Sequence, residues 1–371
     1  MSGGPWEELE AEVASFVASL PEPRSFASLD DRFAHLVEVE RRLHEAGLAV
    51  VAWPERYGGR GLGPEAAAVV AAALGRCEAP DVVNYLALDV VAPGLLAFAT
   101  EEQLDRWLPP MPDASEIWCQ MFSEPDAGSD LAGLRTTARC EGDVYVVSGT
   151  KVWSTWGQFA DRGLALVRTG SPTSRHRGIT AVVVDMRAPG VTVRPLVAMN
   201  GVAEFAEVFF DEVAVPVADR VGDHDDGWAV AMAMLAAERG TYPIRRGSVL
   251  RAALSRLRRQ ADGCGDAEIG RAVVNAEIVM RLLDLRIAAM VGRLAAGESL
   301  GDDPAVTKMM LTRAEQTVRD AELRALGPEA LAPADERVIE DWLYSRASSI
   351  YGGSAEIQRT LIGERILGLP R

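Results

Sequence analysis

The segment that decides the fold runs from Cys119 to Trp156 and reads CQMFSEPDAGSDLAGLRTTARCEGDVYVVSGTKVWSTW. An apolar approach leads into a turn of small residues at 126–130. Gly128 lets the backbone come close to a ligand, and the hydroxyls of Ser123 and Ser129 can both donate and accept hydrogen bonds. This turn is therefore a candidate ligand-binding loop.

Strand-like runs follow the turn, separated by turn signals, at about 135–140, 144–148 and 151–155. Side chains two apart on a strand share a face, so Trp153 and Thr155 would present an indole beside a hydroxyl. That pair suits a flat polar heteroaromatic ring. The spacing alone favours a simpler interpretation, which is a sheet edge with a half-buried tryptophan.

Composition and charge narrow the class of protein. The chain has 371 residues, 48% hydrophobic and 25% charged, as expected for a globular protein of two or three domains. Its formal net charge of −16 argues against binding to nucleic acid or to an anionic membrane, because both need a positive surface.

Cysteine usage and the first residues predict a soluble, cytoplasmic protein. The chain has 4 cysteines without close pairing and no apolar run of membrane-spanning length. The acidic start, MSGGPWEELEAEV, lacks the apolar core of a signal peptide. The 4 histidines show no metal-ligand spacing, so no metal site is predicted.

Hydrophobic periodicity divides the chain into three parts. The predicted domains are an N-terminal helical domain, a central β domain and a C-terminal helix bundle, at 1–115, 116–224 and 225–371. The later predicted strands are 163–168, 179–185, 191–197 and 206–211, and the later helices are 227–260, 266–296, 304–326 and 334–349. The fold class is therefore α+β multidomain, with a barrel-like or sandwich-like centre.

Several motifs together resemble the acyl-CoA dehydrogenase family. F-S-E-P-x-A-G-S-D followed by G-T-K-x-W-x-T is similar to the flavin- and substrate-binding core of that family. Further similar motifs follow in the expected order, at 199–201, 207–211, 215–216, 227–228, 238–239, 351–359 and 367–371. The resemblance covers most of the chain and implies a helical, β and helical domain in succession.

The resemblance implies that FAD is the cofactor. By matching positions, the residues implied to line the flavin are Phe122, Ser123, Gly128, Ser129, Trp153, Ser154, Thr155, Ser354 and Glu356. Ser129 is also implied to lie near the substrate, and Arg239 matches a position that contacts its CoA portion.

The catalytic base is assigned through the same resemblance. Glu238 follows an apolar helical run, where desolvation would raise a carboxyl pKa, although a solvated helix face is the commoner role of such a residue. Family members place this glutamate either in the tail, where this chain has Gly352, or at the position of Glu238, as in branched-chain and long-chain members. Glu238 is therefore the predicted base. The Gly352 N–H is predicted to hold the thioester oxygen, with a flavin ribityl hydroxyl as second donor.

The chain departs from the family at two motifs. Many members carry R-x-x-F-G where this chain has 259–265, and Q-x-x-G-G-x-G where it has 326–329. In the family both motifs reach the flavin pyrophosphate and adenosine across a dimer interface. Either arginines of this chain, such as Arg256, Arg258 and Arg259, or another subunit would have to replace these contacts.

The predicted function is FAD-dependent α,β-dehydrogenation of an acyl-CoA thioester to the trans-2-enoyl-CoA, with electrons passed to an electron-transferring flavoprotein. The chain would form a homo-oligomer, or a heteromer with a sister subunit. Two alternatives remain: a partner subunit with little activity alone, and a related flavoprotein that acts on carrier-protein-bound acyl groups or uses oxygen.

Overall fold

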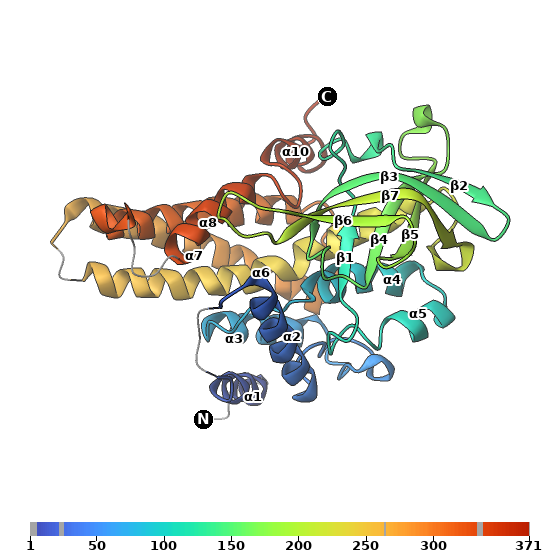
Figure 1. Ribbon diagram of the computed structural model, residues 1–371. Coiled ribbons are helices and arrows are strands. Elements are labelled where there is room, and N and C mark those ends of the chain that lie inside the picture. The colour runs from blue at the N-terminus through green and yellow to red at the C-terminus, as the bar shows by residue number, and fades with distance from the viewer. Residues whose placement is uncertain (1–5, 22–25, 263–264, 332–336, 371) are drawn as a thin grey trace.

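A computed structural model describes residues 6–21, 26–262, 265–331 and 337–370 (Figure 1). N-terminal helices, a β sheet and long C-terminal helices follow one another along the chain, so the predicted α+β fold class is confirmed. The domain bounds at residues 115 and 224 stay predictions. None of the described helices combines the length and the apolar character needed to cross a bilayer.

The N-terminal part consists of short helices whose ends carry sequence-specific caps. The Ser28 side chain accepts a hydrogen bond from Asp31 N at 3.1 Å, and Thr100 with Gln103 forms a capping box. The helices are α1 (Glu7–Ala18), α2 (Leu29–Glu45), α3 (Pro64–Arg76), α4 (Ala92–Phe98) and α5 (Glu101–Trp107), with a π-helical turn at Ala87–Val91 before α4.

Asn84 fixes the junction between these helices and the sheet. Its side-chain amide donates to Met111 O at 3.0 Å and to Glu116 O at 2.9 Å, and its Oδ1 accepts from Trp118 N at 3.0 Å. The Asn84 side chain is buried, so each of these bonds is shielded from water. The first strand is therefore held against the helical domain.

The β domain is one connected sheet made of two halves. The strands are β1 (Trp118–Met121), β2 (Thr137–Glu141), β3 (Val144–Thr155), β4 (Arg162–Arg168), β5 (Ile179–Asp185), β6 (Val191–Leu196), β7 (Phe205–Pro216) and β8 (Arg220–Val221). The halves β6-β7-β3-β2 and β1-β4-β5-β8 join through the single pair Thr137 and Arg168. Side chains of both halves share one core, so the domain is sandwich-like.

The strand prediction for 144–155 was wrong in one respect. The structure has one long strand, β3, where the sequence predicted two runs separated by a turn at 148–150. The register against β7 shifts between Val147 and Gly149, where Gly149 has φ +150° and a Cβ would lie 2.7 Å from the Thr136 backbone. Gly149 therefore marks a bulge within a strand rather than a turn.

The C-terminal part is a helix bundle built on the 35-residue helix α6 (Gly227–Ala261). It packs with α7 (Ala267–Ala295) and α8 (Pro304–Leu326) around the buried side chains of Leu250, Leu283 and Leu311. The predicted helix at 334–349 ends in a tighter turn than expected. It comprises α9 (Arg337–Ser345) and a 3₁₀ turn at Arg346–Ser349, and residues 332–336 lie outside the described part. The chain ends with α10 (Ala355–Leu361) and a π-helical turn at Ile362–Ile366.

Helix α7 carries an apolar stripe on its outer face. Val274, Ile278, Leu282 and Leu285 are spaced by four, four and three residues, so they share one side of the helix. Their exposed fractions are 54%, 55%, 49% and 54%. A contiguous row of large exposed aliphatic side chains is typical of a surface that another protein covers.

Candidate functional site

A buried ion pair fixes the loop that follows Phe122. Lys151 Nζ lies 2.7 Å from Glu124 Oε1 and donates to Phe122 O at 3.3 Å. The Glu124 carboxylate also accepts from Arg135 N at 2.6 Å and Thr136 N at 2.9 Å. The Glu124 carboxylate, near the start of the loop, therefore bonds in the protein interior to the backbone at the end of the loop.

Both members of this pair are charged near neutral pH. Burial would raise the pKa of Glu124, but Lys151 and the donors around the carboxylate outweigh burial and hold the pKa below its ordinary value. Burial lowers the pKa of Lys151 to about 8 against the attraction of Glu124. No role was predicted for either residue from the sequence, although a lysine within an apolar strand indicates a buried ion pair.

Arg168 holds the same loop from its other side. Its guanidinium donates to Ala132 O at 2.7 Å and to Leu134 O and Gly178 O at 3.4 Å each. Arg168 is only 4% exposed, so backbone carbonyls of the loop satisfy a buried cation. The loop thus has a fixed shape, with Gly128 and Ser129 exposed at its tip.

Trp153 lies in a bulge that turns its indole outward. The register between β3 and β7 shifts between Lys151 and Ser154, and Trp153 has φ +61°. Its side chain is 59% exposed, whereas Thr155 is 7% exposed. The predicted two-residue alternation of Trp153 and Thr155 was therefore wrong, because the extra residue of the bulge breaks it.

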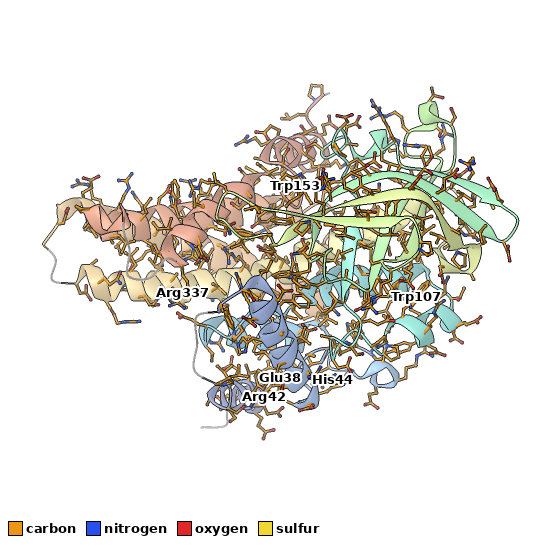
Figure 2. The ribbon with its side chains drawn as sticks, in the orientation of Figure 1. Glu38, Arg42, His44, Trp107, Trp153 and Arg337 are labelled. Carbon is orange, nitrogen blue, oxygen red and sulfur yellow. The ribbon has the colours of Figure 1, made fainter. Side chains whose placement is uncertain are left out.

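The bulge and the loop are neighbours. Val152 N donates to Ser123 O at 2.9 Å, which places Trp153 next to the loop. The edge of Phe205 packs on the Trp153 ring, with centroids 5.7 Å apart at 80°. Figure 2 shows Trp153 at the end of the sheet that is turned toward α8 and α10.

The groups around Trp153 fit a flavin. The Ser154 hydroxyl is buried and has no hydrogen-bond partner among the described residues. A Cβ added to Gly128 would meet no atom within 4 Å, which leaves space above the loop. An exposed indole, an unpaired hydroxyl and an open loop match the apolar face and polar edge of a flavin ring.

The C-terminal tail carries the other predicted residues. Gly352 and Gly353 have φ of +63° and +91°, and Gln358 Nε2 donates to Gly352 O at 3.0 Å. This bond orients the peptide unit between Gly352 and Gly353, which directly follows the Gly352 N–H. The Ser354 hydroxyl caps α10 by accepting from Ile357 N at 3.4 Å, and the exposed Glu356 pairs with Arg359. Neither Ser354 nor Glu356 makes a described contact with the Trp153 region.

The predicted base lies on α6. Glu238 and Arg239 belong to this helix, but their side chains are outside the described part of the structure. One turn later, Tyr242 Oη lies 3.1 Å from Tyr351 Oη. The segment of α6 that follows Glu238 is therefore in contact with the residue that precedes Gly352.

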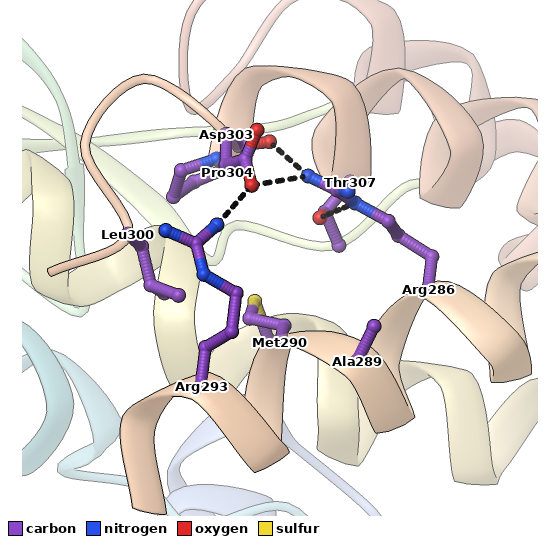
Figure 3. A pocket seen from close by; sticks show the side chains of 8 residues that line it. All are labelled: Arg286, Ala289, Met290, Arg293, Leu300, Asp303, Pro304 and Thr307. Carbon is purple, nitrogen blue, oxygen red and sulfur yellow. Dashed lines mark hydrogen bonds and ion pairs between the residues drawn. The ribbon is translucent and has the colours of Figure 1, made fainter. Parts of the chain in front are cut away.

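A small pocket between α7 and α8 is a weaker candidate for a binding site (Figure 3). Arg286 and Arg293 both point into it and bond to the Asp303 carboxylate. The other nitrogens of Arg293 bond to Glu298 Oε2 at 3.0 Å and Ser299 O at 2.8 Å. Arg286 and Arg293 are therefore already bonded to other residues of the helix bundle, which indicates a structural role.

Comparison with known proteins agrees with this geometry. Residues 6–114, 119–213 and 225–367 match the models of the N-terminal, middle and C-terminal domains of acyl-CoA dehydrogenases. Acyl-CoA dehydrogenase IpdE1 of Mycobacterium tuberculosis is 38% identical over 339 residues, which cover 89% of this chain and 87% of that protein.

Solved structures show the same architecture. One chain of the ChsE4-ChsE5 complex from Mycobacterium tuberculosis superposes with a TM-score of 0.85 at 28% identity, covering 100% of this chain and 99% of that chain. The Tcur3481-Tcur3483 steroid ACAD gives a TM-score of 0.87 at 24% identity, covering 100% and 99%, and this likeness concerns the fold alone. The resemblance stated from the motifs is confirmed: the chain belongs to the acyl-CoA dehydrogenase family of FAD-dependent oxidoreductases.

Proposed function

We propose that the chain catalyses the α,β-dehydrogenation of an acyl-CoA thioester to the trans-2-enoyl-CoA, with Glu238 as the base. The main support for this proposal is the 3.1 Å contact between the hydroxyls of Tyr242 and Tyr351. Tyr242 is one helical turn after Glu238, and Tyr351 directly precedes Gly352. A thioester whose oxygen binds to the Gly352 N–H would therefore lie beside the helix that carries Glu238.

The loop and the bulge would hold the cofactor. Trp153 would cover one face of the ring, and the hydroxyls of Ser123, Ser154 and Thr155 would bond to its polar edge. Phe122, Gly128, Ser129, Ser354 and Glu356 complete the proposed flavin site. FAD supplies the oxidising power when bound, because it can accept the hydride, which carries both electrons of the reaction.

The substrate would be held by residues of three segments. Glu238 takes the α-proton, and the Gly352 N–H would stabilise the negative charge that develops on the thioester oxygen. Ser129 and Arg239 would contact the substrate, Arg239 at its CoA portion. Holding the reacting carbons in line is the main contribution of these groups to the rate. We further propose a cytoplasmic location and an electron-transferring flavoprotein as the acceptor.

A panel of acyl-CoA thioesters tests this function. Under anaerobic conditions, a substrate should bleach the flavin absorbance of the protein, and turnover should then require an added electron acceptor. Air should not replace that acceptor, because an oxidase would use oxygen directly. If no thioester of any chain length or ring content bleaches the flavin, the proposed dehydrogenation is wrong.

Trp153→Ala should weaken the retention of FAD. The indole is 59% exposed in the chain without ligand, so it can provide a packing face that alanine lacks. We expect at least a tenfold weaker affinity, equivalent to about 1.4 kcal/mol, measured as FAD lost on gel filtration and regained on titration. Trp342→Ala on α9 is a matched control. Full retention of FAD in Trp153→Ala would contradict the placement of the ring.

A heteromeric assembly is a second candidate, in which this chain is one of two different subunits. Two observations favour it: the apolar stripe on α7, and the fact that the ChsE4-ChsE5 structure is a complex of two different chains. The divergence at 259–265 and 326–329 also leaves the pyrophosphate of the cofactor without its usual contacts. Burying those charges without donors would be costly.

Expression alone and with a sister subunit distinguishes the two assemblies. If the chain is one half of a heteromer, we expect it to be flavin-poor or insoluble by itself and to gain FAD when co-expressed with its partner. Native mass spectrometry and the ratio of FAD to protein give the result. A homo-oligomer with about one FAD per chain would contradict the heteromer and support self-association.

A further inference from the structure

A cluster of tyrosines joins α6, α9 and the C-terminal tail. We define the tyrosine cluster as Tyr242, Tyr344 and Tyr351. The rings of Tyr242 and Tyr351 are perpendicular at 6.2 Å, with their hydroxyls in contact, and the Tyr344 ring lies 6.1 Å from that of Tyr351. Three hydroxyl-bearing rings from separate elements thus meet at one place.

Charged side chains surround the tyrosine cluster. Arg246 follows Tyr242 by one turn on α6 and bonds through two nitrogens to Glu315 Oε1, with Nε at 3.0 Å. Glu315 is completely buried, and its Oε2 has no hydrogen-bond partner among the described residues. Lys308 Nζ lies 4.1 Å from the centroid of the Tyr351 ring. This oxygen is therefore a buried acceptor with hydrogen-bonding capacity left over within a polar cluster.

Glu204 connects this cluster to the flavin-binding end of the sheet. Its carbonyl accepts from Trp156 N at 2.8 Å, and the next residue, Phe205, packs on Trp153. Burial raises the pKa of Glu204 to about 7, and the carboxylate interacts electrostatically with Arg246 and with Tyr344. The cluster and the bulge therefore border the same space.

The tyrosine side chains are half-buried, and all three keep accessible surface. Burial raises the pKa values of their hydroxyls, so these groups stay protonated at physiological pH. The hydroxyls are thus neutral groups that can donate and accept hydrogen bonds.

The sign of the charges indicates which part of a substrate fits. Two carboxylates, Glu204 and Glu315, would repel the phosphates of CoA, and Arg246 is already neutralised by Glu315. A carboxylate on the ligand would meet the same repulsion. A neutral oxygen can instead accept from a tyrosine hydroxyl, and a hydroxyl can also donate to a carboxylate.

We propose that the tyrosine cluster, together with Arg246 and Glu204, is a recognition subsite for a hydroxyl or ketone oxygen on the acyl group of the substrate. This inference rests on the proposed function, because it places the acyl group one helical turn beyond Glu238. The rings of the tyrosine cluster would pack against a ring-containing acyl group. A hydrocarbon in this place could not bond to these polar groups, so the subsite selects against plain fatty acyl chains.

A matched set of thioesters tests the subsite. The probes are 3-(4-hydroxycyclohexyl)propanoyl-CoA, 3-(4-oxocyclohexyl)propanoyl-CoA and 3-cyclohexylpropanoyl-CoA, used with the FAD-loaded protein in its complete assembly. We expect kcat/KM to be about 10- to 100-fold higher for an oxygenated probe than for the hydrocarbon. Tyr344→Phe should reduce this ratio by about tenfold, without lowering the rate for the hydrocarbon.

Tyr145→Phe is the control, since its hydroxyl bonds to His224 Nδ1 at 2.9 Å on the β domain. It should leave the ratio unchanged. Equal kcat/KM for the three probes, or equal losses for all three in Tyr344→Phe, would overturn the subsite.

Calorimetric titration of Glu238→Gln with the same probes separates this inference from the proposed function, because binding needs no turnover. Preferential binding of an oxygenated probe supports the subsite even if no flavin is reduced, in which case only the dehydrogenation is refuted. Equal affinities for the three probes would refute the subsite by itself.

Discussion

Glu238→Gln is expected to abolish reduction of the flavin by substrate while the protein keeps its fold and its FAD. Glutamine has nearly the same shape as glutamate but cannot accept the α-proton at neutral pH. A general base contributes about 10²- to 10⁴-fold to a rate, so we expect a loss of that size in the anaerobic rate of flavin bleaching. Glu238 is the single carboxylate in the sequence of α6, so no neighbour on that helix can replace it.

The control for this variant is Glu277→Gln on α7. Glu277 pairs with Arg258 at 3.0 Å on the surface of the bundle, so its change should leave the bleaching rate within about twofold. Circular dichroism and the FAD ratio of Glu238→Gln verify that only the chemistry is lost. A variant that bleaches at the wild-type rate would place the base on another residue.

The second large effect concerns stability. Lys151→Met should lower the free energy of unfolding by about 3–5 kcal/mol, because it leaves the Glu124 carboxylate buried without its cation. The same change should loosen the loop between Phe122 and Thr136, so FAD should also be lost more easily. Urea denaturation monitored by tryptophan fluorescence measures the first effect, and the FAD ratio measures the second.

Two further variants show whether the buried pair causes the loss. Lys151→Met combined with Glu124→Gln removes the unpaired charge and should be more stable than Lys151→Met alone. Asp126→Asn removes a surface pair with Arg135 in which both side chains are more than three quarters exposed, and it should change stability by less than about 0.5 kcal/mol. A Lys151→Met protein as stable as Asp126→Asn would show that the buried pair is not needed.

Elements with regular periodicity could be predicted from the sequence. The bounds of α8 and β5 agree with the predicted 304–326 and 179–185, because both have continuous patterns that end at Pro, Gly or charged residues. The bulge at Trp153 could not be predicted in this way. Its positive φ depends on pairing with a strand more than 50 residues away, and residue types alone do not encode that register.

The part of the candidate site that could be predicted from the sequence is the part that forms a local motif. The loop around Gly128 and the bulge beside it occur within one segment, so their residues could be named together. The tyrosine cluster joins Tyr242 to two tyrosines that lie about 100 residues later in the chain, and each tyrosine has an ordinary helical or loop context. Its polarity becomes evident only when the helices are packed.

The apolar stripe on α7 has a consequence for the thermodynamics of the isolated chain. If another subunit covers Val274, Ile278, Leu282 and Leu285, part of the free energy of folding is supplied by association. The melting temperature then depends on the protein concentration and rises with it by mass action. Dilution would lower it, and the cell would set the stability of this protein through the amounts of the subunits that it makes.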